Sequence, residues 1–404
     1  MFISFLYPFP LRGLRAPFLW VAFKQMGDLG ADQVAFIASD DYFVDPERYR
    51  RMGRFDCHAP VNPELGFRVP THAEADGFAR GLIPDQLYQR LKARLLSDTL
   101  VWRHLITEVD DELVELICEQ VERLSRHAPC EALLTWCNYA SLSEAATRLG
   151  LPLLHGELGP LRTPWYRPLG YLDFIGVNGH TEAAARWQAS APLANAFADI
   201  PSLRAALRLY PLPDHIPEAV DARLGIPLQV EDDSNVLAYG NGFDMWLLIQ
   251  YAREEYERED LLIRPHPGAH LSPSGDFRLD DSPDSAAFVN RCERLLTLNS
   301  SVAVEAMLME RPVSILGDSP ARHLAGHGLD DARLATLAEL EFLLLNYFVP
   351  YDLLFDAEYL RWRLRRPSEA AIRARHLQTM TVLPTSTWSS LHPSLRSAYP
   401  TDEE

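Results

Sequence analysis

The sequence predicts an α/β protein made of two domains, each built on a parallel sheet. The chain has 404 residues, which is more than a single hydrophobic core usually serves. Short apolar runs alternate along it with segments of helical period, and this alternation is typical of α/β folds. Polar or glycine-rich turns follow the apolar runs of the second half, as they do at the ends of sheet strands.

The first half of the chain contains a well-marked strand, helix and strand. Residues 132–135 are predicted as a strand, 141–149 as a helix that Gly150 ends, and 151–154 as the next strand. Strands joined through a helix are usually parallel. Before this unit we expect a buried first strand at the apolar start, a second strand at 31–37, and helices over 83–127.

Four prolines in residues 211–227 predict a linker between the domains, because proline fixes φ and removes a hydrogen-bond donor. A regular series of strands and helices follows: strands at 228–230, 260–264, 294–298 and 312–316, and helices at 242–256, 285–292, 302–309 and 357–380. We therefore expect an N-terminal domain at 1–215, a C-terminal domain at 216–345, and C-terminal helices and a tail at 346–404 that pack back across the cleft.

The composition indicates which binding partners and which cellular compartment to expect for the protein. The net charge of −18 disfavours nucleic acid, which requires an excess of positive charge. Five cysteines without a CxxC pair suit a reducing compartment. No apolar run reaches the roughly 18 residues of a membrane span, and the start lacks the basic region of a secretory signal. We expect a cytoplasmic protein.

Three polar clusters each follow a predicted strand of the second domain: EDDS at 231–234, RPHPG at 264–268 and LNSS at 298–301. In open parallel sheets, ligands bind beyond the carboxyl ends of the strands. The clusters are therefore predicted to converge on one site, although tens of residues separate them along the chain.

Two of these clusters have the chemistry of an anion site. Asn299, Ser300 and Ser301 open a helix, where hydroxyls and unpaired backbone N–H groups favour a phosphate or carboxylate. His266 lies between two prolines after Arg264, and both side chains suit a phosphate leaving group. The alternatives are ordinary N-capping by a serine and a strand-end turn with an incidental histidine.

Carboxylates follow strands in both domains. Asp232 is the middle residue of Glu231–Asp232–Asp233, and a carboxylate at a strand end can act as nucleophile or base in glycosyl transfer. In the first domain, Glu157 could be an acid or base and Arg162 an anion clamp. The alternatives are a solvated acidic turn and a loop ion pair.

Common cofactor motifs are missing from the sequence. It contains no GxxxxGK[ST], GxGxxG, HExxH, GxSxG or Asp-x-Asp. We therefore expect no metal and no cofactor, with protein donors neutralising any donor phosphate.

Taken in order, the clusters resemble those of the retaining β-Kdo glycosyltransferases of bacterial surface polysaccharide synthesis, the WbbB and KpsC type. The pieces that carry the resemblance are QVEDDSN at 229–235, IRPHPG at 263–268, LTLNSSVAVEAMLMERPVSILG at 296–317, LLTWCNYA at 133–140 and HGELGPLR at 155–162. A weaker likeness is to bacterial sialyltransferases. This sequence departs from capsule-type members in having PHPG and NSSVAVEA.

The resemblance implies a GT-B fold of two Rossmann-like domains facing a central cleft, CMP-β-Kdo as donor, and a lipid-linked glycan of O-antigen or capsule synthesis as acceptor. It implies a catalytic nucleophile at Asp232, a general base at Glu157, and phosphate contacts at His266, Ser300, Ser301 and Arg264. It further implies Kdo or acceptor contacts at Arg162, Glu231 and Asn299.

Other functions stay open at this point. An inverting CMP-sialic-acid-type transferase would use Asp232 as a base, and a glycan-binding module of a polysaccharide assembly complex would have no activity. A two-domain nucleotide-sugar epimerase would require UDP-sugars. Further domains, assembly partners and attachment at the inner face of the bacterial inner membrane through the arginine-rich segment 360–367 are also open.

Overall fold

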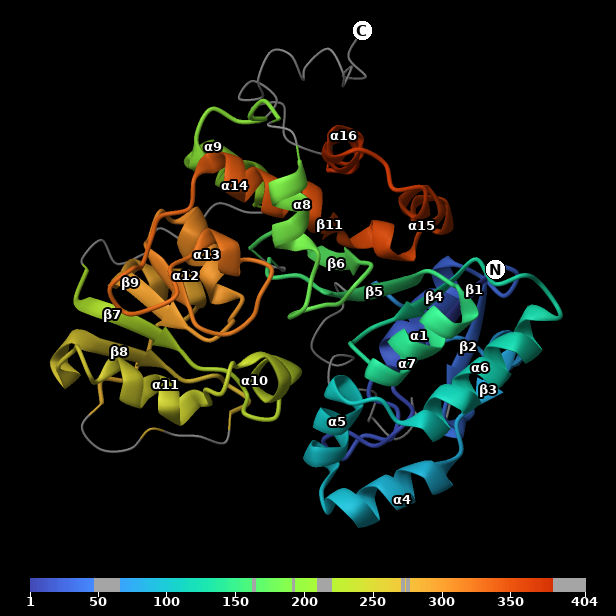
Figure 1. Ribbon diagram of the computed structural model, residues 1–404. Coiled ribbons are helices and arrows are strands. Elements are labelled where there is room, and N and C mark those ends of the chain that lie inside the picture. Colours follow the sequence, from blue (N-terminus) through green and yellow to red (C-terminus); the bar gives the residue numbers. More distant parts are fainter. Residues whose placement is uncertain are drawn as a thin grey trace, which may run out of the picture. The chain divides into compact units, whose positions relative to one another are not determined.

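The computed structural model shows a chain whose main elements are two α/β units (Figure 1). The structure describes residues 1–46, 66–161, 165–190, 193–208, 220–269, 273 and 277–380. Unit 1 comprises Met1–Glu157, Leu172–Val177 and Asp352–Arg366, and unit 2 comprises Leu158–Tyr171, Asn178–Tyr351 and Pro367–Glu404. The α/β class predicted from the sequence is confirmed. The boundaries expected at 215 and 345 stay predictions.

The first sheet has the strand order β11-β6-β5-β4-β1-β2-β3. Its strands are β1 Phe2–Phe5, β2 Val34–Ala38, β3 Arg80–Leu82, β4 Ala132–Thr135, β5 Leu153–Leu158, β6 Leu169–Asp173 and β11 Val349–Pro350. The strands from β5 to β3 pair in parallel, and β11 is antiparallel to β6. Chain order places the switch in direction between β1 and β4, because β2 and β3 lie on one side and β5 on the other.

The helices of unit 1 connect these strands, except that α15 follows β11. They are α1 Leu19–Asp28, α3 His72–Asp76, α4 Asp85–Leu95, α5 Asp98–Thr107, α6 Asp111–Ser125, α7 Ala140–Leu149 and α15 Ala357–Leu364. The long helical segment predicted over 83–127 is thus three helices. The predicted strand, helix and strand at 132–154 are confirmed, and Gly150 ends α7 in the left-handed conformation with φ of 63°. Glycine is favoured there because it has no Cβ to clash.

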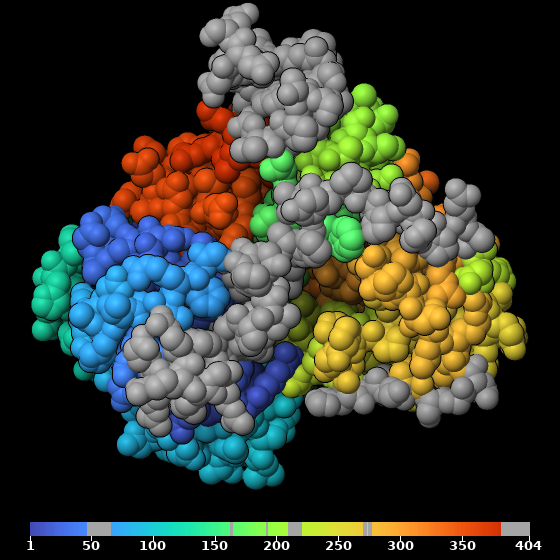
Figure 2. All heavy atoms as spheres, turned by 180° about the vertical axis from the view of Figure 1, so that it is seen from behind, coloured from blue at the N-terminus to red at the C-terminus, as the bar shows by residue number. Residues whose placement is uncertain are grey.

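The second sheet has the order β10-β9-β7-β8, and its strand pairs are parallel. Its strands are β7 Ala222–Pro227, β8 Leu261–Arg264, β9 Cys292–Thr297 and β10 Val313–Ile315. In Figure 2 the yellow and orange side chains of this segment form one contiguous body.

Helices cover both faces of this sheet. Leu224, Ile226 and Leu228 share a core with Leu248 and Ile249 of α11. On the other face, a Cβ on Gly225 would lie 3.0 Å from the ring of Phe288 in α12, so glycine permits the close approach of that helix. The helices of unit 2 are α8 Ala183–Ala189, α9 Ile200–Leu207, α10 Ser234–Tyr239, α11 Met245–Ala252, α12 Ser285–Asn290, α13 Val302–Leu308, α14 Leu337–Glu341 and α16 Glu369–Thr379.

The four strands of the second sheet end at the same level. Pro227 pairs with Arg264 across β7 and β8, and Ile315 pairs with Thr297 across β10 and β9. Strands β7 and β9 are also in parallel register. The segments that follow all four strands therefore leave the sheet along one edge.

One predicted strand is wrong. Residues 228–230 are not a strand, because the central strand β7 runs from Ala222 to Pro227 within the segment predicted as linker. Proline is tolerated there because Pro227 is the last residue of the strand. Helix α10 was also not predicted, since six residues carry little periodic signal.

Candidate functional site

The carboxyl edge of the second sheet brings the three predicted motifs together. Chain order runs from β7 to β8 on one side and then to β9 on the other side of β7, so the switch point lies between β7 and β9. Ligands of open α/β sheets bind at such a point. The EDD segment follows β7, the NSS segment follows β9, and His266 follows β8. The three motifs therefore follow strands that end along one edge, and their convergence on a single site stays a prediction.

The acidic segment forms a turn that leads into α10. Asp233 is the N-cap of this helix, and its Oδ1 accepts a hydrogen bond of 2.9 Å from the Asn235 N–H. Glu231 and Asp232 are half-buried in the turn before it, and the Oδ1 atom of Asp232 is shielded from solvent. Asp233 thus caps α10, while Asp232 has one shielded carboxylate oxygen at the carboxyl edge of the sheet.

The Asn299 side chain links the segments that follow β7 and β9 through hydrogen bonds. Its Oδ1 accepts from Gln229 Nε2 at 2.9 Å, and its Nδ2 donates to the carbonyls of Asn235 at 2.9 Å and Tyr239 at 3.3 Å. The side chain is buried. These contacts fix the position of α10 relative to β9.

The two serines differ in their surroundings. Ser300 is half-buried, its N–H donates to Thr297 Oγ1 at 3.2 Å, and its Oγ accepts from the Val302 N–H at 3.3 Å. Ser301 is exposed and makes no side-chain cap of α13. Ser300 thus takes part in the local turn, and Ser301 presents its hydroxyl to solvent.

The two residues predicted after β8 have different environments. His266 is exposed, and its Nδ1 accepts from the Gly268 N–H at 3.0 Å, which holds the ring on its own loop. Arg264 forms an ion pair with the buried Asp280 and donates to the Ser282 carbonyl at 3.1 Å. The loop that carries His266 is therefore anchored where it leaves the sheet.

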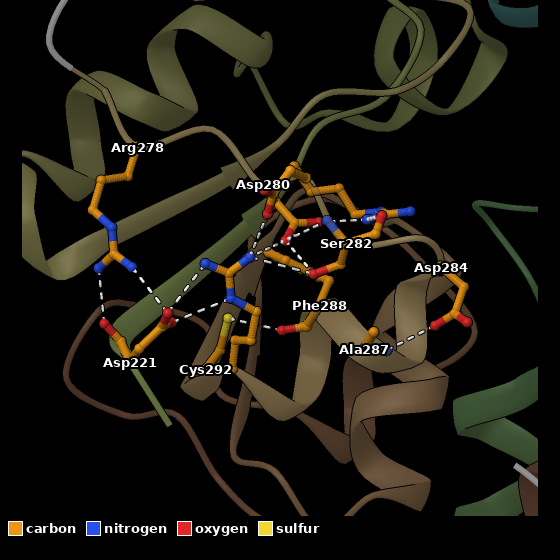
Figure 3. A network of polar contacts seen from close by, with 11 residues as sticks. Asp221, Arg278, Asp280, Ser282, Asp284, Ala287, Phe288 and Cys292 are labelled. Atoms are coloured by element: carbon orange, nitrogen blue, oxygen red, sulfur yellow. Dashed lines mark hydrogen bonds and ion pairs between the residues drawn. The ribbon is translucent and has the colours of Figure 1, made fainter. Parts of the chain in front are cut away.

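Asp280 belongs to a larger network (Figure 3). Arg291 Nη1 lies 3.0 Å from Asp280 Oδ1, and Arg291 Nη2 lies 3.1 Å from Asp221 Oδ2. Arg278 joins the same Asp221 at 3.2 Å. Asp280 is fully buried between Arg264 and Arg291, so removing either arginine would leave its charge poorly compensated.

In unit 1, Glu157 lies in β5, next to its last residue, and is half-buried. It lies close enough to Cys137, after β4, to add to the rise in the pKa of that thiol, which is caused mainly by burial. Glu157 is thus at the carboxyl edge of the first sheet. Arg162 lies outside the described residues.

The sequence analysis assigned no role to a second acid at the edge of the second sheet. Asp318 follows β10, its N–H donates to the Tyr239 carbonyl at 2.8 Å, and its Oδ2 accepts from the His180 N–H at 2.8 Å. The signal was present in the Gly317–Asp318 turn after the last strand. The link to His180 could not be read, because it spans 138 positions of the chain.

Neither metal ligands nor a membrane span is found in the part of the chain that the structure describes. That part holds no group of three or more His, Cys, Asp or Glu side chains placed for a metal ion. None of its helices is long and apolar enough to cross a bilayer. In the arginine-rich segment, Arg361 pairs with Glu131 at 2.7 Å and Arg363 is buried against Tyr359.

Known proteins are similar to this chain in part or in whole. Residues 4–182 match the family model of the glycosyltransferase 99 family N-terminal domain. None of the curated protein sequences compared with the chain matches it.

Solved structures that resemble the chain are glycosyltransferases. KpsC of Thermosulfurimonas dismutans is similar in its β-Kdo 2,7 transferase, at 18% identity and a TM-score of 0.42 over 57% of this chain and 82% of that chain. Its β-Kdo 2,4 transferase is 16% identical, with a TM-score of 0.39 over 52% and 78%. The Streptomyces sp. SF2575 glycosyltransferase SsfS6 is 12% identical, with a TM-score of 0.27 over 96% and 97%.

The family match over residues 4–182 agrees with the predicted resemblance to glycosyltransferases of the WbbB and KpsC type, and the two α/β units with their parallel strands agree with the predicted fold class. Over residues 4–182, this chain is similar to the N-terminal domain of the glycosyltransferase 99 family.

Proposed function

We propose that this chain is a retaining β-Kdo transferase, which moves Kdo from CMP-β-Kdo to a glycan acceptor. The observation that carries the proposal is the common level at which β7, β8, β9 and β10 end. The segments that follow these strands carry Asp232, His266, Ser300 and Ser301, and this arrangement supports a donor site at the switch point. The acceptor would be a lipid-linked polysaccharide of O-antigen or capsule synthesis, reached in the cytoplasm at the inner membrane.

The donor phosphate is assigned to the segments after β9 and β8. The exposed Ser301 hydroxyl, Ser300 and the His266 ring are hydrogen-bonding groups on the edge where a nucleotide binds in such sheets. CMP carries a single phosphate, so a few protein donors can offset its charge as it leaves. We propose that no metal takes part.

Asp232 is proposed as the nucleophile. One carboxylate oxygen attacks the anomeric carbon of Kdo, and the bond to the phosphate oxygen breaks with its electron pair leaving on CMP. Glu157 then takes the proton of the acceptor hydroxyl, whose oxygen attacks the same carbon and releases Asp232. Two inversions give net retention. Shielding of Asp232 Oδ1 from water strengthens its interaction with the positive charge that develops on the sugar.

The other predicted residues have supporting roles in this proposal. Arg264 is committed to Asp280, and Asn299 to Gln229 and α10, so both position the loops that contact the donor. Glu231, in the same turn as Asp232, is assigned to the Kdo or acceptor. Arg162 is assigned there by resemblance alone.

The test is an incubation with enzymatically generated CMP-Kdo and short synthetic acceptors. NMR of the product reports the anomeric configuration, and intact-protein mass spectrometry reports a Kdo adduct. A β-linked product and an adduct on the Asp232 peptide are expected. An inverted product without adduct would favour the sialyltransferase-like mechanism, and absence of CMP release would favour a glycan-binding module.

A further inference from the structure

A short segment with two left-handed residues reaches the edge of the second sheet. Asn178 and His180 have φ values of 66° and 54°, and Gly179 lies between them. A Cβ on Gly179 would lie 2.3 Å from the ring of Tyr239, so only glycine fits that position. Asparagine and histidine are among the residues that adopt this backbone most readily after glycine, so the segment forms a tight turn that Gly179 brings against Tyr239.

Two contacts hold this segment against the donor edge. The His180 N–H donates to Asp318 Oδ2 at 2.8 Å, and the His180 ring packs edge-on against Tyr239 with centroids 5.4 Å apart. The Tyr239 carbonyl accepts from Asp318 and from Asn299, next to the two serines. His180 is therefore attached to the segments that follow β7, β9 and β10.

The backbone at position 180 does not require an imidazole. Glycine would adopt the same φ at lower cost and would still donate its N–H to Asp318. The imidazole of His180 is exposed, so burial does not account for it either. One edge of the ring packs on Tyr239, and the exposed part of the imidazole lies at the carboxyl edge of the sheet, where its N–H can reach a ligand.

The charges at the carboxyl edge of the second sheet indicate which part of a ligand the His180 imidazole would contact. Glu231, Asp232 and Asp318 are acidic, and the chain as a whole carries −18. The Arg264 guanidinium is committed to Asp280. A donor with a phosphate and a carboxylate requires nitrogen donors here, and His266 supplies one of them.

We propose that the His180 imidazole binds an anionic oxygen of the sugar-nucleotide donor. The inference rests on the proposed function, because it assigns His180 to that same site. The oxygen belongs either to the phosphate of CMP or to the carboxylate of the keto-sugar, and both offer the same acceptor to an imidazole N–H.

The test compares His180→Gly and His180→Asn with Asn178→Gly. Both His180 variants allow left-handed backbone, and Asn178→Gly relieves the same strain while leaving the imidazole in place. Calorimetry gives the Kd of CMP, kinetics give the KM for CMP-Kdo, and thermal unfolding gives Tm. We expect Tm to be unchanged or raised in Asn178→Gly and slightly lowered in the His180 variants, which lose the ring contact with Tyr239. Donor binding should weaken about tenfold or more in the His180 variants only, since hydrogen bonds to charged groups are the stronger ones.

The pattern across ligands identifies the oxygen. If His180 binds the phosphate, the Kd of CMP and the KM for CMP-Kdo rise together; if it binds the carboxylate, only the KM rises. Unchanged values in both His180 variants, or an equal loss in Asn178→Gly, would overturn the inference while the proposed function stands. A wild-type chain that neither binds CMP nor consumes CMP-Kdo would overturn both.

Discussion

The two parallel sheets end in edges of different composition. At the first sheet, the segments after β1 and β4 place Tyr7, Trp136 and Tyr139 in the core, where all three are buried. At the second sheet, the segments after β7 and β9 place Asp232 half-buried and Ser301 in solvent. Tyr7 and Tyr139 stack on one another with ring centroids 5.8 Å apart. The segments after β1 and β4 thus contribute packed aromatic side chains, whereas those after β7 and β9 contribute polar side chains.

This difference assigns different chemistry to the two edges. Burial raises the pKa values of Tyr7, Tyr139 and Cys137, so their phenols and thiol stay protonated near neutral pH. A protonated thiol or phenol is a poor nucleophile. In the proposed mechanism, the first edge supplies the base Glu157 and the second edge supplies the nucleophile Asp232.

The largest effect is expected from removing the carboxylate charge at each edge in turn. Asp232→Asn should lower transfer by about 10³-fold or more and abolish the Kdo adduct, because the amide cannot form the glycosyl ester. Glu157→Gln should slow transfer while the adduct accumulates, because only the second displacement needs the base. Mass spectrometry and CMP release separate the two outcomes.

The matched control for Asp232→Asn is Asp233→Asn in the same turn. Asparagine caps a helix about as well as aspartate, so this variant should keep both α10 and activity. If Glu157→Gln and Asp232→Asn lose the Kdo adduct equally, Glu157 is needed before the adduct forms, and the proposed assignment of the two displacements to the two edges is wrong.

Much of this arrangement could be predicted from local sequence. The unit from 132 to 154 and the strands β8, β9 and β10 follow from apolar runs, turn residues and Gly150. Strand β7 was missed because the prolines that precede it, together with Pro227 at its end, resemble a linker. Periodicity shows which segments are strands, but a proline at a strand end does not differ in sequence from one in a loop.

The polar motifs were predicted to meet because parallel strands end together, and the structure shows contacts between the segments that follow β7 and β9. What sequence could not give was the partner of each side chain. Asp280 pairs with Arg264 from 16 positions away, and Gln229 reaches Asn299 from 70. Such pairs depend on tertiary packing, so the positioning roles of Arg264 and Asn299 emerge only from the structure.

The carboxyl edge of the second sheet also depends on the hydrogen bonds of the buried Asn299 side chain, which a second variant would remove. Asn299→Leu removes the hydrogen bonds to Gln229 Nε2 and to the carbonyls of Asn235 and Tyr239. Because buried polar groups left unpaired cost about 1–3 kcal/mol each, we expect a loss of about 3 kcal/mol in the free energy of unfolding. Urea titration measures it. Ser301→Ala, at an exposed site on the same edge, is the control. If Asn299→Leu lowers the free energy of unfolding by less than this control does, the Asn299 hydrogen bonds do not stabilise the edge.

Acid should destabilise unit 1 through the buried His155 and unit 2 through the half-buried His323. Burial lowers the pKa of His155 in unit 1 and of His323 in unit 2 to about 4, from an ordinary value of 6.5. Their contribution is complete above pH 6.5 and is lost as the pH falls toward 4, because the unfolded chain binds the proton first. His155→Leu should flatten the fall in unfolding free energy between pH 6.5 and 4, and His127→Gln, at an exposed site, should not.

The smallest effect on stability is expected from the ion pair between Arg361 of α15 and Glu131, which precedes β4 in unit 1. Arg361 holds the pKa of Glu131 down at about 2, from an ordinary value of 4.5. The carboxylate therefore stabilises the fold fully above pH 4.5, and this contribution is lost as the pH falls through 2. Because the pair is partly exposed, Glu131→Gln should cost only about 1 kcal/mol at pH 6 and less as the pH approaches 2. Denaturant titrations at both pH values measure it, with Glu119→Gln on the exposed face of α6 as control; a cost that grows on acidification would show that Arg361 does not set this pKa.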